Sequence, residues 1–233
     1  MVGCLIIHGF TGGPYELGPL TEYLKEHTNW DIKVPVLPGH GRILALKNVS
    51  YKKWIKKAED VMKQLKKKYD EIYVIGFSMG GMIAAYLAAK YNIDKLVLLA
   101  TSGKYLSLGQ ISRDIGLVIA DGCRGRLGEN KLYIHYKKKI GMVPFRANIE
   151  FLKLVRYTKP YLKKVEAPVL IAQGQQDGMV PARTAYYLDK EINSVHKEVI
   201  FFDRSKHLIC LGDDKDTLNT MIFNFLEKPK SNI

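Results

Sequence analysis

The segment of residues 73–91, YVIGFSMGGMIAAYLAAKY, constrains the fold of this chain most strongly, because it changes from strand to helix around one serine. The residues YVI before Ser78 favour an extended backbone, whereas the alanines and leucine after it favour a helix. Ser78 therefore lies on the turn between a strand and a helix. Glycines on either side of it leave room for a sharp turn.

Gly76, Ser78 and Gly80 fit the pattern G-x-S-x-G, in which a serine hydroxyl projects outward from a strained turn as a nucleophile. The alternative is an ordinary strand-to-helix turn, because glycine and serine occur in many turns. A serine hydroxyl becomes a good nucleophile only when a histidine removes its proton and a carboxylate orients that histidine. The two interpretations therefore differ in whether the chain also supplies a histidine and an acid.

Strands alternate with helices along most of the chain, which predicts an α/β fold with a mostly parallel central sheet flanked by helices. The continuous apolar run 2–7 is typical of a strand buried on both faces, and 51–69 has helical apolar spacing. The other predicted helices are near 14–27, 79–91, 181–190 and 213–227, and the other predicted strands are near 32–36, 72–75, 95–100, 169–173 and 198–202.

The alternation stops after the strand that ends near Ala100. We interpret residues 103–164 as a small helical cap inserted into a single domain of 1–233, because the segments 115–120 and 149–156 look helical. The 103–164 segment carries fourteen Lys and Arg against four Asp and Glu, and so holds ten of the chain's net charge of +13. This basic cap could attract anionic lipid surfaces or negatively charged esters, or it could be an ordinary solvated face.

The amino-acid composition is typical of a globular protein without a membrane-spanning segment. The 233 residues are 47% hydrophobic and 25% charged, as in globular domains. No apolar run approaches the roughly 18 residues that span a bilayer, and the start MVGCLIIHGF lacks the basic region and cleavage site of a secretion signal. Cys4, Cys123 and Cys210 lack paired or metal-type spacing, which predicts packing roles and a cytoplasmic protein.

Candidates for the acid and the base follow Ser78 at the carboxyl ends of later predicted strands. Asp177 comes just past the strand in APVLIAQG, although an aspartate there could also only form the turn or cap the next helix. His207 lies in the loop DRSKHLI after the next strand, where a histidine would otherwise be a surface residue. Asp203 is the rival acid, ranked second because it ends the histidine's own strand and would have to turn inward.

The remaining histidines are assigned by context. His8 and His40 lie in glycine-bracketed loops, where we expect them to hold the loops in shape rather than to transfer protons. We expect His27, His135 and His196 at the surface.

Five motifs, HGFTGGP, LPGHG, GFSMGG, QGQQDGMVP and SKHL, occur in an order and spacing that resembles the small carboxylesterase and monoacylglycerol lipase branch of the α/β-hydrolases. The resemblance covers nearly the whole chain. It implies Ser78 as nucleophile, Asp177 as acid and His207 as base. It also implies an oxyanion hole made by the backbone N–H groups of Phe10 and Met79.

Two features depart from many relatives. Lys206 stands where they have glycine, and its charge would oppose protonation of His207 if the two charged groups lay close. The chain also begins almost at the strand that leads into the oxyanion loop, so we expect a sheet without one or two of the edge strands of larger relatives.

The preferred interpretation is a cofactor-free serine hydrolase that forms an acyl-enzyme on Ser78. We expect short- to medium-chain acyl esters, including monoacylglycerols, as substrates. The predicted acyl pocket would be lined by Phe10, Met79, Leu117, Val118, Ile119 and Phe145.

Several alternatives stay open. Thioesterase, lysophospholipase and acyltransferase activities use the same groups, and a non-catalytic ligand-binding protein could share the fold. Dehalogenase and epoxide hydrolase activities are disfavoured because they need a carboxylate where Ser78 stands. Nucleic-acid binding is disfavoured because the basic chain lacks a recognition motif. We expect no cofactor and no metal, and a monomer or homodimer.

Overall fold

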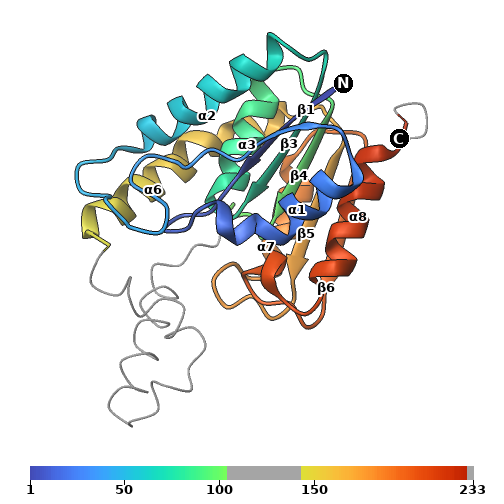
Figure 1. Cartoon of the computed structure of the whole chain (residues 1–233). Coiled ribbons are helices and arrows are strands. Elements are labelled where there is room, and N and C mark those ends of the chain that lie inside the picture. The colour runs from blue at the N-terminus through green and yellow to red at the C-terminus, as the bar shows by residue number, and fades with distance from the viewer. Residues whose placement is uncertain (104–142, 230–233) are drawn as a thin grey trace.

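The computed structural model describes residues 1–103 and 143–229. In these residues one six-stranded sheet has the order β2-β1-β3-β4-β5-β6. All the pairings between neighbouring strands are parallel. The prediction of an α/β fold with a mostly parallel sheet is therefore confirmed. Figure 1 shows helices on both faces of this sheet.

The element bounds follow the predicted order. The strands are β1 (Val2–Ile7), β2 (Asp31–Lys33), β3 (Glu71–Phe77), β4 (Lys95–Leu99), β5 (Val169–Gly174) and β6 (Lys197–Phe202). The α-helices are α1 (Gly18–His27), α2 (Tyr51–Lys66), α3 (Met79–Lys90), α6 (Phe145–Thr158), α7 (Arg183–Glu191) and α8 (Lys215–Glu227), and the 3₁₀ helices are η1 (Pro14–Leu17), η3 (Lys159–Lys164) and η4 (Ile209–Leu211). The strand predicted near 32–36 ends early, at Lys33, before Pro35, which has no N–H to donate.

The two faces of the sheet bury separate hydrophobic cores. Alternate residues of β1 point to opposite sides, so Leu5 and Ile7 enter one core and Cys4 and Ile6 enter the other. The first core is covered by α2, α3, α6, η3 and α7, and the second by α1 and α8. Every residue of β1 is buried, as its continuous apolar run predicts.

Helix α2 shows why these helices form and dock. Ser50 precedes it in an extended conformation, and its apolar residues return every three or four positions, which places Trp54, Ala58 and Leu65 on one buried stripe. The lysines between these positions are exposed. The hydrophobic stripe therefore fixes the helix against the sheet, and the lysine-rich side faces solvent.

The last part of the predicted cap packs into the body of the molecule. Phe151 and Leu154 of α6 belong to the same buried core as α2 and α3. Glu150 of α6 accepts a hydrogen bond from the backbone N–H of Tyr51 at the start of α2, at 3.1 Å. This part of the 103–164 segment is thus a member of the helical layer. The predicted helix at 115–120 lies outside the described residues, so the cap itself stays a prediction.

Two of the three cysteines lie in the described residues, and both are buried. Burial raises the pKa of the Cys4 thiol, and it raises the pKa of Cys210 to about 12. Both behave as packing residues, whereas Cys123 lies outside the described part. In that part, no helix combines the length and apolar composition that crossing a membrane requires.

Candidate active site

The candidate site lies at the carboxyl ends of the strands, at the point where successive strands are added on opposite sides of β1. After β1 the chain adds β2 on one side, and β3 pairs on the other side of β1. In open parallel sheets, ligands bind outside the carboxyl ends of the strands at such a point. The loop after β1 and the turn after β3 are therefore the first places to look for chemistry.

Ser78 occupies a strained turn between β3 and α3. Its φ of 53° and ψ of −115° lie in a region that residues with a side chain rarely adopt. The backbone N–H of Ser78 donates to the carbonyl of Leu99 at 2.8 Å, which ties the turn to β4. A Cβ added at Gly80 would lie 2.2 Å from the carbonyl oxygen of Ile7. The turn thus needs glycine to bring α3 close to β1.

His207 reaches Ser78 from the loop after β6. Its Nε2 lies 3.1 Å from Ser78 Oγ, and its Nδ1 lies 2.8 Å from Asp177 Oδ2. The ring packs against Phe77, with 5.1 Å between the ring centroids. All three polar residues are buried. The predicted nucleophile, base and acid are therefore in one hydrogen-bonded row.

Asp177 is held rigidly in the loop after β5. Its Oδ1 accepts the backbone N–H groups of Met179 and Val180, both at 2.8 Å. Its Oδ2 accepts the side-chain amide of Gln173 at 3.0 Å in addition to His207. Because a carboxylate only accepts hydrogen bonds, His207 must carry its proton on Nδ1. The Nε2 atom is then free to accept the proton of Ser78.

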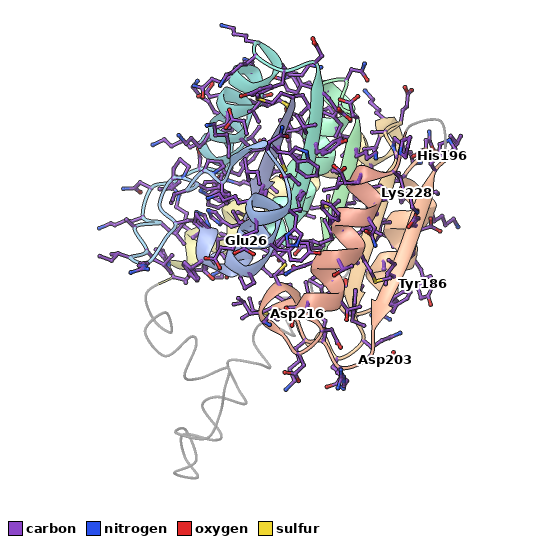
Figure 2. The ribbon with its side chains drawn as sticks, turned by 45° about the vertical axis from the view of Figure 1, so that its right-hand side comes forward. Glu26, Tyr186, His196, Asp203, Asp216 and Lys228 are labelled. Carbon is purple, nitrogen blue, oxygen red and sulfur yellow. The ribbon has the colours of Figure 1, made fainter. Side chains whose placement is uncertain are left out.

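The rival acid lies away from this row. Asp203 is exposed at the end of β6, and Figure 2 shows it on the outside of the molecule. Its backbone carbonyl accepts a hydrogen bond from the Gln176 side chain at 3.0 Å. Lys206 is also exposed, whereas His207 beside it is buried. The order of preference between Asp177 and Asp203 thus agrees with the geometry.

His8 and His40 organise the loops beside the site, as expected. Nε2 of His8 accepts the backbone N–H of Leu37 at 3.1 Å, and its Nδ1 lies 2.9 Å from the carbonyl oxygen of Gly9. The Nε2 contact therefore joins the loop after β1 to the loop after β2, and the Nδ1 contact lies within the loop after β1. His40 lies 5.2 Å from Trp54 between ring centroids and packs edge-on against it.

The histidines expected at the surface are found there where the structure describes them. His27 and His196 are exposed, and Figure 2 shows His196 at the outer edge of the molecule. His135 lies outside the described residues.

The two predicted oxyanion donors come from the segments that follow β1 and β3. Phe10 is in the loop after β1, and Met79 is the first residue of α3. The first N–H groups of a helix have no acceptor within that helix, so the N–H of Met79 is not used by the hydrogen bonds of α3. The Phe10 ring stacks on Phe151, with 4.9 Å between centroids. This stack connects the loop after β1 to α6.

The predicted acyl-pocket residues have mixed outcomes. Met79 is fully buried in the core, and Phe10 packs against that core. Phe145 is 78% exposed at the first residue of α6, and its place in the acyl pocket stays a prediction. Leu117, Val118 and Ile119 lie outside the described residues.

A residue that the sequence analysis did not single out also reaches the nucleophile. Ser102 follows β4, and its Oγ lies 3.0 Å from Ser78 Oγ. Its backbone N–H also donates to the carbonyl of Ser78 at 3.3 Å. The signal that could have identified it is position, because β4 pairs with β3 and both strands end at the same edge.

The described residues contain no group of three or more His, Cys, Asp or Glu that could hold a metal ion. The polar groups that meet at the site are instead two hydroxyls, an imidazole and a carboxylate. Such a set can deprotonate a serine hydroxyl and stabilise the imidazolium that results.

Comparison with known proteins places these features in a family. Residues 5–125 match the model of a family described as the alpha/beta hydrolase fold. The chain is 27% identical over 242 residues to a thermostable monoacylglycerol lipase of Bacillus sp. (strain H-257), covering 97% of this chain and 91% of the relative. It is 23% identical over 227 residues to a carboxylesterase of Bacillus subtilis (strain 168), covering 96% and 92% of the two chains.

A solved structure is similar over the same length. The monoacylglycerol lipase of Paleococcus ferrophilus matches with a TM-score of 0.71 and 16% identity, covering 96% of this chain and 93% of that one. At this identity the likeness supports the shared fold alone.

Proposed function

Because the chain belongs to the α/β-hydrolase family, we propose that it hydrolyses carboxylic esters through an acyl-enzyme formed on Ser78. The observation that carries the proposal is the buried row of Ser78, His207 and Asp177, joined at 3.1 and 2.8 Å. The relatives named monoacylglycerol lipase and carboxylesterase support the same class of reaction.

In the acylation step, Ser78 Oγ attacks the carbonyl carbon of the ester while His207 Nε2 takes the serine proton. The carboxylate of Asp177 stabilises the imidazolium and keeps its ring in orientation. His207 then gives the proton to the alcohol oxygen as the carbon–oxygen bond breaks. The alcohol leaves, and the acyl group stays on Ser78.

The backbone N–H groups of Phe10 and Met79 stabilise the negative oxygen of the tetrahedral intermediate. Loss of one such donor typically costs about 2.7–4 kcal/mol of transition-state stabilisation. The positive end of the α3 dipole adds to this stabilisation, because Met79 begins that helix. Water activated by His207 then releases the acid and restores Ser78.

Short- to medium-chain acyl esters, including monoacylglycerols, are the proposed substrates. The half-buried ring of Phe10, in the loop after β1, supplies apolar surface there and is held in place by its stack on the buried Phe151. An acyl chain in contact with such surface is removed from water, which favours binding. The relative with a monoacylglycerol lipase name supports this substrate class.

An anionic lipid surface is the proposed environment of such substrates. Helices α2, α6 and η3 carry twelve Lys and Arg against three acids, whereas α1 and α8 on the opposite face carry two Lys against four acids. All twelve basic side chains are exposed: Lys52, Lys53, Lys56, Lys57, Lys63, Lys66, Arg146, Lys153, Arg156, Lys159, Lys163 and Lys164. A face with a large excess of positive charge attracts an anionic surface over about one Debye length.

Vesicle sedimentation tests whether the basic face of α2, α6 and η3 binds anionic lipid. The double variant Lys53→Glu and Lys57→Glu on α2 should weaken binding to phosphatidylglycerol vesicles, and added salt should weaken it further. The matched control, Lys25→Glu with Lys215→Glu on α1 and α8, should bind as the wild type does. Equal binding to phosphatidylcholine vesicles, or equal loss in both double variants, would contradict this part of the proposal.

Covalent labelling tests the reaction itself. A fluorophosphonate probe should modify the native protein at Ser78 and leave Ser78→Ala unmodified, whereas a ligand-binding protein without catalysis would not be labelled. Specificity constants for a series of chromogenic esters, thioesters and monoacylglycerols would then separate esterase, thioesterase and lipase activities. Failure of the native protein to label would reject the proposed mechanism.

A further inference from the structure

A second hydroxyl touches the proposed nucleophile. Ser102 is 1% exposed, and its Oγ lies 3.0 Å from Ser78 Oγ. The backbone of Ser102 is fixed in the same place, because its N–H donates to the carbonyl of Ser78 at 3.3 Å. The two serines are 24 positions apart in the chain, so the contact depends on the pairing of β3 with β4.

The directions of the hydrogen bonds can be worked out from the available protons. Asp177 accepts the Nδ1 proton of His207, so Nε2 of that ring is an acceptor. Ser78 has one hydroxyl proton, and it points to Nε2. The remaining contact, between Ser78 and Ser102, therefore needs a proton from Ser102. In the resting site Ser102 is the donor, and Ser78 Oγ is the acceptor.

We propose that Ser102 is a further catalytic residue, which donates a hydrogen bond to Ser78 Oγ and stabilises that oxygen as a leaving group when the acyl-enzyme breaks down. The inference rests on the proposed acyl-enzyme function. Ser102 keeps its own proton throughout the cycle and forms no bond to carbon. Its effect is electrostatic and is exerted on the oxygen that gains and loses the acyl group.

The two hydrogen bonds orient the nucleophile before substrate arrives. The tetrahedral oxygen of Ser78 has four directions, and three are used by Cβ, by the proton shared with His207 and by the proton of Ser102. One lone pair is left to attack a carbonyl carbon. A free hydroxyl rotor is thereby held in one arrangement, which lowers the entropy cost of attack.

The hydrogen bond from Ser102 gains strength mainly during deacylation. In the acyl-enzyme, Oγ is an ester oxygen and accepts hydrogen bonds poorly. Water then adds to the carbonyl carbon while His207 takes its proton, and the carbon–Oγ bond breaks as the same proton passes to Oγ. Negative charge builds on Oγ in that transition state, so a donor at 3.0 Å stabilises it more than it stabilises the acyl-enzyme.

Burst kinetics of Ser102→Ala test the inference. With a p-nitrophenyl ester, the burst gives the acylation rate constant and the steady state gives the deacylation rate constant. We expect deacylation to slow by about tenfold and acylation by less, so that acyl-enzyme accumulates. Ser102→Thr keeps the hydroxyl and should restore deacylation to within about threefold of the wild type.

Thr101→Val is the matched control in the same loop. Thr101 is also buried, and its hydroxyl has no hydrogen-bond partner in the described part of the chain. We expect both rate constants of this variant to stay within about twofold of the wild type.

Two outcomes would overturn the role of Ser102. One is a Ser102→Ala variant with both rate constants within twofold of the wild type. The other is an equal fall in both constants, which a displaced Ser78 would produce. The wild-type burst separates these results from a failure of the proposed function, because a protein without an acyl-enzyme shows no burst at all.

Discussion

Buried polar groups have different roles at the carboxyl ends and at the amino ends of the strands, here called the carboxyl edge and the amino edge of the sheet. At the carboxyl edge, the loops hold Ser78, Asp177 and His207 in a buried row whose hydroxyl can be deprotonated. At the amino edge, Lys95 begins β4 and is also buried, but its Nζ donates to the backbone carbonyls of Phe225, Leu226 and Lys228 at the end of α8. The carboxyl edge therefore holds groups that can react, whereas the buried charge at the amino edge is fully used in hydrogen bonds to backbone carbonyls.

Backbone strain follows the same division. Among the described residues, the non-glycine residues with left-handed φ are Thr11, Asn48, Ser78 and Ala100. All four lie in segments that leave the carboxyl ends of strands, after β1, β2, β3 and β4 in that order. Each such residue costs about 1–3 kcal/mol.

At the amino edge, buried and partly buried polar groups form hydrogen bonds that stabilise the fold. Asp94 Oδ2 accepts the backbone N–H of Ile72 at 2.6 Å, and this bond joins the approach to β4 to the start of β3. Burial lowers the pKa of Lys95, and the carbonyls at the end of α8 offset part of the cost of placing a charge there. We infer that changes to the polar side chains at the carboxyl edge act mainly on rates and that changes to those at the amino edge act mainly on stability.

The largest expected effect is the loss of Ser78. Ser78→Ala should lower kcat/KM for a chromogenic ester by about 10⁵-fold or more, because the hydroxyl that lies against His207 Nε2 is lost. The free energy of unfolding should change little, since the backbone hydrogen bonds of the turn remain. Residual activity above one hundredth of the wild type would reject Ser78 as the nucleophile.

Asp177→Asn should lower kcat by about 10³- to 10⁴-fold. The new amide would bring N–H groups toward donors on Gln173 and His207, and the imidazole would turn to the tautomer that protonates Nε2. The matched control is Asp203→Asn, which changes an exposed acid at the same edge and should leave kcat within twofold. Equal effects of the two substitutions would show that Asp177 has no special role.

Gly80→Ala should affect both rate and stability. Its Cβ would lie 2.2 Å from the oxygen of Ile7 and 2.6 Å from that of His8, so α3 must shift away from β1. We expect the free energy of unfolding to fall by about 3 kcal/mol and the ester hydrolysis rate to fall with it. Gly178→Ala is the control for urea unfolding, since an added Cβ there has nothing within 4 Å.

Lys95→Met should lower the free energy of unfolding by about 2–3 kcal/mol, because carbonyls at the end of α8 lose a buried donor. The kcat/KM at 25 °C should stay within about twofold of the wild type, since the amino edge is remote from the reacting groups. Urea unfolding and ester assays on one preparation measure both. A tenfold fall in rate with unchanged stability would break the division between the two edges.

The smallest expected effect is that of Gly18→Ala at the start of α1. Gly18 has φ of −51° and ψ of −58°, which alanine adopts readily, and an added Cβ has nothing within 4 Å. The substitution should raise the free energy of unfolding by about 0.5–1 kcal/mol through a less flexible unfolded chain. Thermal unfolding measures the gain, and a loss of stability would contradict the helical role of this position.

The parts of the site that could be predicted from sequence are those that follow from strand order. Asp177 and His207 were identifiable because parallel strands end at one edge, and each residue comes just after a strand. Ser102 obeys the same rule, but a serine after a strand is too common to stand out without the distance to Ser78. Lys95 could not be identified as buried, since its acceptors lie 130 or more positions away in the sequence.

The same limit applies to the predicted cap. Periodic apolar residues predicted a helix over 149–156, and α6 contains it. The exposure of Phe145 could not be predicted, because one apolar residue at the first position of a helix has no repeat to assign its side. The packing of α6 against α2 and α3 depends on contacts between distant segments, which local pattern does not encode.

The residues of the polar row lie far apart in the sequence, so ester hydrolysis requires that all the strands between them pair correctly. Ser78 and His207 are separated by 129 positions, and the strands that carry them, β3 and β6, have β4 and β5 between them. A slip of one residue in any of these pairings would move a loop by about 3.3 Å, more than the whole length of the bond between the acid and the imidazole. A collapsed chain with all its helices but a misaligned sheet would therefore give the circular-dichroism signal of helices and would not hydrolyse an ester.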